Sequence, residues 1–315
     1  MSDVPVLKGL HHVTAITANA SANLDFYTRI LGLRLVKKTV NQDDASAYHL
    51  FYADAIGSPG TDMTFFDWSH AAPARTGAGT VSETSFRILG DANTLTCWQQ
   101  WFDENKVSHD KVAVSSESTA TLAFRDAEGQ RLRLVAEPRR DGESGFHPWK
   151  ESPVPKEAAI VGLEGVTLTV SDFAPTAQIL SEVLGFRTNN TNSSLYELGA
   201  GGSGTRLHLS TSKVRGNTGA GGVHHVAWRV DDLAQQQAWL KHLNSHGIPT
   251  SGIIDRFYFH SLYFRIPGGI LFEIATEGPG FSADESLEDL GGKLSLPPFL
   301  ESQRAQIERG LKPLA

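Results

Sequence analysis

The chain has 315 residues, 40% of them hydrophobic and 20% charged, which is the composition of a folded protein with one large or two smaller domains. Its net charge of −7 at pH 7 and its lack of Lys or Arg runs give no basic surface for nucleic acid or an anionic membrane. We therefore expect small-molecule partners, and neither a nucleic acid nor a membrane.

Cysteine usage and the amino terminus indicate the compartment. Cys97 is the only cysteine, so no disulfide forms within the chain, and the first residues lack the charged and apolar regions of a signal peptide. No apolar stretch reaches the roughly 18 residues needed to cross a bilayer. These features predict a soluble protein of the reducing cytoplasm. We interpret Cys97, in a Trp-containing helix, as a core thiol.

In chain order, the predicted elements repeat one unit four times. Each unit is a strand, a helix and three strands joined by turns, at residues 8–68, 80–137, 160–211 and 221–276. The helices of the first and third units end in Leu-Gly, where Gly32 and Gly185 supply the left-handed cap. The sequence therefore predicts an α+β fold of four βαβββ modules.

The repeat also divides the chain into two halves. We predict an N-terminal domain, 1–150, with the first two modules, and a C-terminal domain, 151–315, with the other two and a tail. A polar, proline-containing connection at 138–158 joins them. The tail is expected to end in a helix at 298–311 that packs on the body.

Two His-His pairs stand at equivalent places in the repeat, His11-His12 in the first strand of module one and His224-His225 in that of module four. Modules two and three have Glu83 and Gly165 there. His224 shares its strand face with apolar residues that suit helix packing, so His225 should face a cavity. Parity leaves His11 and His12 undecided, and alignment with His225 favours His12.

A carboxylate completes a candidate metal site. Glu273 points away from its apolar neighbours in the last strand of module four, and Tyr263 does the same in the preceding strand. A buried charge among apolar residues favours a cation beside it. Two imidazoles and one carboxylate leave about half of an octahedral ion's positions open, which suits non-haem Fe(II) that binds a substrate and dioxygen together.

Each of these residues also has a structural reading. A single strand histidine is more often a hydrogen-bonded core residue than a ligand, Glu273 could belong to an ion pair, and Tyr263 and Arg256 could be structural. The two pairs at equivalent repeat positions favour the metal site. Because the ligands come from modules one and four, we expect those modules to share one metal-bearing cup and modules two and three to form a second cup without metal.

These repeats resemble the βαβββ modules of the vicinal oxygen chelate superfamily, which includes glyoxalase I, fosfomycin-resistance proteins and extradiol ring-cleaving dioxygenases. Nearly the whole chain looks like the hydroquinone-type ring-cleaving dioxygenases, which open para-diols. The resemblance rests on residues 10–14, 48–54 with 57–61, 224–225, 256–263 and 267–273. The loop at 41–47 departs from characterised members, which bears on substrate fit.

The resemblance implies a cofactor, partners and roles for single residues. It implies that His12, His225 and Glu273 bind Fe(II), with Mn(II) as the alternative metal, and that the partners are a small aromatic substrate and O2. It places further residues on the substrate side of the metal or behind its ligands: His11, Thr14, His224, Arg256 and Tyr263.

The predicted function is therefore an Fe(II)-dependent opening of a hydroquinone-type or related aromatic diol with O2. One alternative is a glyoxalase-type isomerase or thiol transferase, which needs a second carboxylate; Phe65 aligns with Glu273 and argues against it, although a two-residue shift would bring in Asp67. The other is a metal-free protein that binds a small aromatic. The ring substituents, the regiochemistry and the formation of a homo-oligomer stay open.

Overall fold

The computed structural model describes residues 4–115, 119–139, 145–189 and 192–314. Module one consists of β1 (Leu10–Thr17), α1 (Ala20–Asp25) with a π-helical turn (Phe26–Ile30), β2 (Arg34–Asn41), β3 (Asp44–Ala53) and β4 (Asp62–Asp67). Module two has β5 (Thr80–Leu89), α2 (Ala92–Glu104), β6 (Ala113–Val114), β7 (Ala120–Arg125) and β8 (Arg131–Glu137).

The other two modules repeat this order. Module three consists of β9 (Ile160–Val170), α3 (Phe173–Gln178) with a π-helical turn (Ile179–Val183), β10 (Arg187–Thr188), β11 (Leu195–Glu197) and β12 (Arg206–Thr211). Module four has β13 (Gly222–Val230), α4 (Leu233–Ser245), β14 (Thr250–Asp255), β15 (His260–Arg265) and β16 (Leu271–Thr276). The predicted fold class is confirmed. Part of the predicted connection, 140–144, lies outside the described residues.

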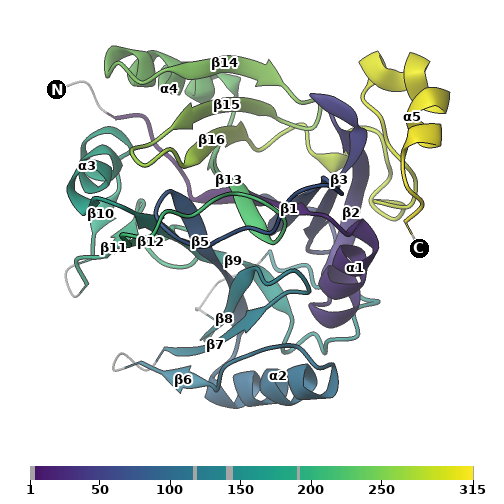
Figure 1. Cartoon of the computed structure of the whole chain (residues 1–315), viewed down its shortest axis with the longest axis horizontal. Helices are drawn as coiled ribbons and strands as arrows, with labels where there is room; N and C mark the ends of the chain where they lie inside the picture. Colours follow the sequence, from purple (N-terminus) through teal and green to yellow (C-terminus); the bar gives the residue numbers. More distant parts are fainter. Residues whose placement is uncertain (1–3, 116–118, 140–144, 190–191, 315) are drawn as a thin grey trace.

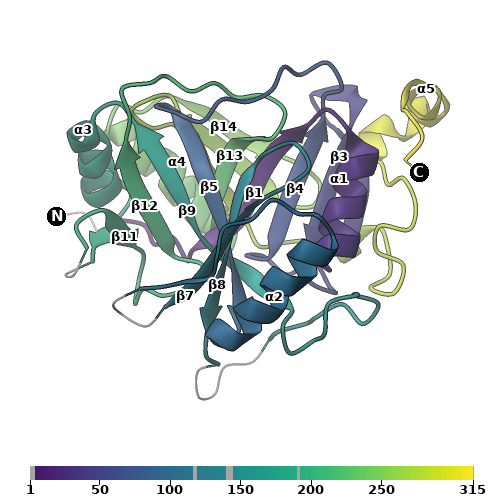
Figure 2. The same ribbon diagram turned by 60° about the horizontal axis from the view of Figure 1, so that its bottom comes forward.

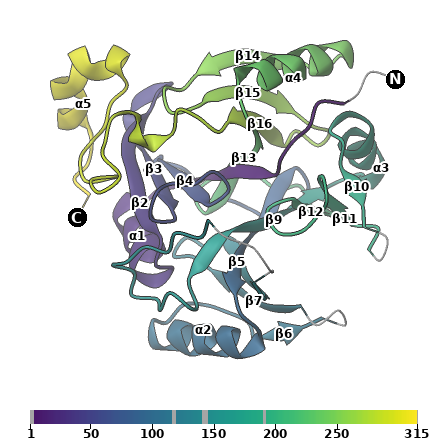
Figure 3. The same ribbon diagram turned by 180° about the vertical axis from the view of Figure 1, so that it is seen from behind.

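In the described part of the chain the strands form two eight-stranded sheets. One has the order β14-β15-β16-β13-β1-β4-β3-β2 and the other β10-β11-β12-β9-β5-β8-β7-β6. Modules four and one therefore share the first sheet, in the upper part of Figure 1, and modules three and two share the second, below it; Figure 3 shows both from behind. The predicted pairing of modules is confirmed. Each sheet takes one module from each half of the chain. The sheets therefore do not coincide with the predicted domains 1–150 and 151–315, and that division stays a prediction.

Helices cover the outer faces of the sheets. Figure 2 shows α2 against β7 and β8, where it buries Leu95, Trp98 and Phe102 on one face. Cys97 lies on the opposite face and is exposed, so the expectation of a core thiol is wrong. No helix in the described ranges is long and apolar enough to cross a membrane.

Beta-bulges interrupt the pairing of β1 with β13 at both His-His pairs. Leu10 faces Trp228 and His12 faces Ala227, which leaves His11 as the extra residue in β1. Thr14 faces His225 and Ala15 faces Val223, which leaves His224 as the extra residue in β13. A bulge re-aims side chains beside it, so simple alternation fails at these positions.

The C-terminal tail closes one side of the first sheet. Phe281 and Leu290 of the tail join a small apolar cluster with Phe51 and Tyr258 on its concave side. Lys37 of β2 is fully buried and pairs with Asp284 and Glu285 of the tail. The tail ends in a 3₁₀ turn (Pro298–Gln303) followed by α5 (Arg304–Gly310), which lies beside β3 (Figure 1).

Candidate metal centre

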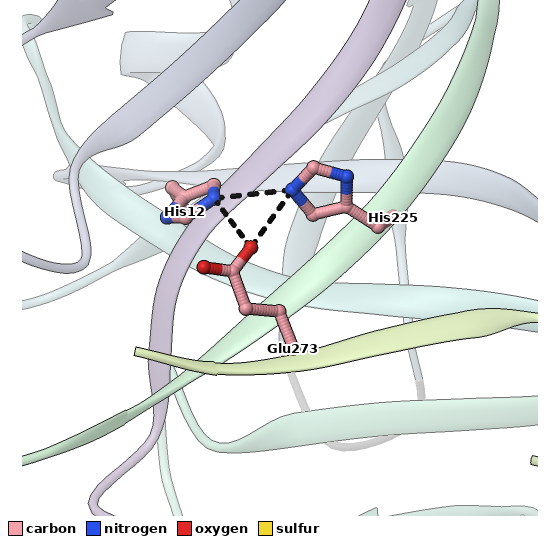
Figure 4. A group of neighbouring side chains, drawn as sticks. All are labelled: His12, His225 and Glu273. Carbon is pink, nitrogen blue, oxygen red and sulfur yellow. Dashed lines mark hydrogen bonds and ion pairs between the residues drawn. The ribbon is translucent and has the colours of Figure 1, made fainter. Parts of the chain in front are cut away.

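Three side chains from three neighbouring strands converge in the first sheet. His12 comes from β1, His225 from β13 and Glu273 from β16, and all three are buried (Figure 4). The two Nε2 atoms are 3.3 Å apart. Oε2 of Glu273 lies 3.3 Å from Nε2 of His12 and 3.0 Å from Nε2 of His225. We refer to these three residues as the triad.

The triad fits a divalent metal ion. Ligand atoms at about 2.0–2.2 Å from one ion, at right angles to each other, are about 3 Å apart, which is the spacing seen here. Ser261 Oγ donates a hydrogen bond of 2.5 Å to Oε1 of Glu273, whereas Oε2 is buried and accepts no hydrogen bond from the part of the chain that the structure describes. A fully buried carboxylate oxygen that faces two imidazole nitrogens is costly without a cation.

Each triad histidine is held from behind by the histidine before it. His11 Nε2 lies 3.2 Å from the carbonyl oxygen of Thr276, which can only accept, so this nitrogen carries the proton. His11 Nδ1, 2.9 Å from His12 Nδ1, then accepts and leaves the lone pair of His12 Nε2 directed at the triad. His225 Nδ1 lies 2.7 Å from His224 Nδ1 in the same way.

The electrostatics keep the supporting histidines neutral and the carboxylate charged. Burial, and next the neighbouring His12, lower the pKa of His11 to about 3; burial and His225 do the same for His224. Burial alone would raise the pKa of Glu273, but the imidazoles of His12 and His225 hold that pKa well below its usual value. An ionised carboxylate is the form of this side chain that binds a metal cation.

A cavity of about 310 Å³ opens beside the triad, and His12, His225 and His224 lie in its wall. His224 contacts the rings of Phe66 and Trp68, at centroid distances of 5.5 and 5.6 Å. The expectation that His224 lies on the helix-packing face is therefore wrong, because the bulge turns it toward the cavity. Other aromatic side chains of the wall are Phe51, Tyr258, Phe259 and Tyr263.

Of the other predicted residues, Arg256 and Tyr263 reach the cavity and Thr14 does not. The guanidinium of Arg256 lies 5.6 Å from the centroid of the Tyr263 ring, which is 5.6 Å from that of His225. Thr14 is buried behind the wall and shares a hydrogen bond of 2.8 Å with the Thr64 hydroxyl. His11 is also buried there, against Phe259.

The loop that departs from the family pattern lies at the cavity mouth. Asn41, Gln42 and Asp43, at the tip of the β2–β3 hairpin, line the cavity. Both oxygens of Asp43 accept hydrogen bonds from Arg256, at 2.9 and 2.8 Å, and Gln42 Nε2 donates to the Arg256 carbonyl at 2.7 Å. The hairpin tip therefore fixes the place of Arg256.

The register identifies the counterpart of Glu273 in module one. Glu273 faces Ala227, two residues after His225, and Thr64 faces Thr14, two residues after His12. The alignment with Phe65 is thus wrong by one residue. Phe65 packs in the core, 4.6 Å from the Tyr27 ring. Within the described residues neither Asp67 nor another carboxylate joins the triad, so a four-ligand site is not formed.

The second sheet replaces the triad with an ion pair. Glu83 faces Thr167 and Ser85 faces Gly165, so Glu83 and Gly165 occupy the places of the triad histidines, as predicted. Arg133 of module two faces Ser85. This is the position that Thr64 has in module one and Glu273 has in module four. The Arg133 guanidinium binds both oxygens of Glu83, at 2.7 and 3.0 Å. A guanidinium therefore stands where the first sheet has its candidate metal site.

Several cavity residues escaped prediction, above all His49 with Phe51 and Phe66. A signal for His49 is present in the sequence, since it shares its strand parity with Phe51. Tyr258 and Phe259 follow Phe257, whose φ of 70° turns the loop sharply, and nothing in the residue type indicates that conformation.

Comparisons with known proteins identify the family that the chain resembles. The model of the Glyoxalase/Bleomycin resistance protein/Dioxygenase superfamily matches residues 9–143 and 162–274. The "Putative ring-cleaving dioxygenase MhqA" of Bacillus subtilis (strain 168) is 43% identical, over 98% of this chain and 99% of its own length. The "Chlorohydroquinone/hydroquinone 1,2-dioxygenase" of Sphingobium indicum is 32% identical, over 96% of this chain and 95% of its own.

Solved structures share the fold. A "putative dioxygenase" from Bacillus subtilis has a TM-score of 0.90 at 37% identity, with 98% of each chain covered. Glyoxalase I from Zea mays has a TM-score of 0.61 at 14% identity, with 85% of this chain and 92% of its own covered, and shows likeness of fold alone.

Proposed function

Because the chain belongs to the hydroquinone-type ring-cleaving dioxygenases of the Glyoxalase/Bleomycin resistance protein/Dioxygenase superfamily, we propose that it opens the ring of a hydroquinone or a related aromatic diol with O2. The proposal includes Fe(II), with Mn(II) as the alternative, bound by His12, His225 and Glu273. The observation that carries it is the convergence of these three ligand atoms beside an aromatic-walled cavity.

The cavity residues have distinct proposed roles. When bound, the metal would lower the pKa of a phenolic hydroxyl and couple the ring electronically to dioxygen. Phe51, Phe66 and Trp68 would hold the ring and exclude water. The Tyr263 hydroxyl would donate a hydrogen bond to an oxygen of the reacting molecules, and the cationic Arg256 would attract an ionised phenol. His11 and His224 would hold the triad imidazoles in their tautomer.

Among the described residues the triad has no fourth ligand, which argues for this chemistry over that of an isomerase. Thr64 occupies the counterpart of Glu273 and offers only a hydroxyl, which is already hydrogen bonded to Thr14. A three-residue set leaves positions for both a substrate oxygen and dioxygen. The proposed enzyme therefore differs from a glyoxalase-type isomerase in its ligand number.

The decisive test is metal analysis and oxygen uptake. Protein purified without oxygen, as suits the reducing cytoplasm in which we place it, should contain iron and should consume O2 with some of a panel of hydroquinones and catechols. Nickel or zinc, with no oxygen uptake after iron loading, would favour an isomerase instead. A protein that takes up no metal at all would be an aromatic-binding protein.

The hairpin tip gives a smaller prediction. We expect Asp43→Ala to raise KM for the best diol about 3- to 10-fold and to leave iron content unchanged. The variant loses the bidentate ion pair that fixes Arg256, and the exposure of Asp43 limits the strength of this ion pair. Steady-state kinetics with separate kcat and KM measure this. Asp44→Ala is the matched control, since among the described residues the carboxylate of Asp44 accepts hydrogen bonds from its near neighbour Ser46 alone. An unchanged KM for Asp43→Ala would contradict the role of the hairpin tip.

A further inference from the structure

The imidazole of His49 lies in the cavity wall and has no role in the proposed function so far. It belongs to β3 and lies between two aromatic rings, 4.0 Å from the centroid of Phe51 and 4.4 Å from that of Phe66. Its Nε2 is 3.0 Å from the hydroxyl of Thr64. Thr64 in turn shares its hydrogen bond with Thr14, and both threonines are fully buried.

This chain of hydroxyls orients the imidazole. Thr64 stands at the counterpart of Glu273, so His49 is anchored at the place where a four-ligand site would have its second carboxylate. Burial, and next His12 and His225, lower the pKa of His49 well below its usual value, so the ring is neutral with one N–H and one lone pair. The hydrogen bond to Thr64 uses Nε2.

Nδ1 of His49 is the nitrogen that remains. It has no hydrogen-bond partner within the ranges that the structure describes, and the ring is partly exposed in the cavity wall. A ring nitrogen that no protein group satisfies can form a hydrogen bond with a ligand, and the cavity is where a ligand can bind. Tyr263 and Arg256 come from β15 and its preceding loop, on the other side of the triad in the sheet order, so His49 adds a polar group to the β3–β4 wall.

We propose that His49 is a further substrate-contacting residue, whose Nε2–H donates to Thr64 and whose Nδ1 accepts a hydrogen bond from the diol hydroxyl that is not directed at the triad. Thr64 and Thr14 are then positioning residues that hold the imidazole in place. This inference rests on the proposed function. It makes His49 a determinant of specificity for diols over phenols whose second oxygen carries no proton.

Hydroquinone and its monomethyl ether, 4-methoxyphenol, provide the probes. Binding to the iron-loaded protein is measured without oxygen, by quenching of tryptophan fluorescence, because Trp68 lines the cavity. The wild type should bind hydroquinone more tightly than the ether. The preference for the diol is the Kd of the ether divided by the Kd of hydroquinone. In His49→Phe this ratio should fall about 3- to 10-fold, the contribution of one hydrogen bond, with iron content unchanged.

Two further variants separate the ring nitrogens. His49→Asn keeps a polar group near the position of Nδ1 and should retain part of the preference for the diol. His49→Gln keeps a polar group near the position of Nε2 and should lose this preference. They also serve if His49→Phe fails to fold. His208→Phe, on β12 of the other sheet, is the matched control and should leave both Kd values and the iron content unchanged.

The outcomes distinguish this inference from the proposed function. If the wild type binds and consumes the diol but His49→Phe and His49→Gln keep its preference over the ether, His49 does not contact that hydroxyl. If the wild type neither binds a diol nor takes up oxygen with any, the proposed function fails and this inference falls with it.

Discussion

Glu273→Gln is expected to fold and to lose most of its bound iron and nearly all of its oxygen uptake. The amide keeps the volume of the carboxylate and can still accept from Ser261, but it removes the charge at Oε2 that faces His12 and His225. Loss of groups that merely support a ligand costs about 10- to 100-fold in metal affinity, so loss of a ligand should cost more. Iron per chain and oxygen uptake measure both effects.

Thermal unfolding gives this variant a second, independent readout. Iron should raise Tm of the wild type, since a ligand that binds only the folded state stabilises it, and should leave Tm of Glu273→Gln unchanged.

Glu83→Gln is the matched control for this prediction. It makes the same change in the other sheet, where it breaks the ion pair with Arg133. It should lower the stability of the fold but leave iron content as it is. Wild-type iron content and turnover in Glu273→Gln would show that Glu273 is not a ligand.

Regular pairing explains which parts of the site could be predicted from the sequence. β15 and β16 pair without a register shift and place Tyr263 opposite Glu273, so simple alternation gave the correct face for both. The pairing of modules one and four followed from the His-His pairs, because a common ion needs its ligands within a few ångströms of each other. Repeat boundaries were also accessible, since Gly32 and Gly185, with φ of 72° and 75°, end their helices as predicted.

Irregular backbone explains what could not be predicted. His224 is the extra residue of a bulge in β13, and a bulge has no reliable signal in a single sequence, so its face was assigned wrongly. The alignment of Phe65 with Glu273 was a one-residue error, and in a strand a shift of one residue selects a side chain on the opposite face of the sheet. Asp43 meets Arg256 through a tertiary contact between residues 213 positions apart, for which the sequence carries no local pattern.

The role of the Tyr263 hydroxyl separates proton handling from metal binding. Burial, and next the charge of Glu273, raise the pKa of Tyr263, so the hydroxyl keeps its proton and can donate at neutral pH. Tyr263→Phe removes this one group and leaves the ring against Arg256 and His225. Iron should therefore stay bound, while kcat should fall about 10- to 10⁴-fold, the range for loss of a proton donor or an oriented hydrogen bond.

Tyr258→Phe is the matched control, because both tyrosines lie in the cavity wall but the Tyr258 hydroxyl donates to Asp284 of the tail, at 2.9 Å. Its loss should lower stability, with a far smaller effect on kcat. Full activity of Tyr263→Phe on the best substrate would leave Tyr263 as part of the cavity wall alone. Loss of iron from that variant would instead mean that the hydroxyl acts on the ligands, because a group that only handles protons leaves the metal affinity unchanged.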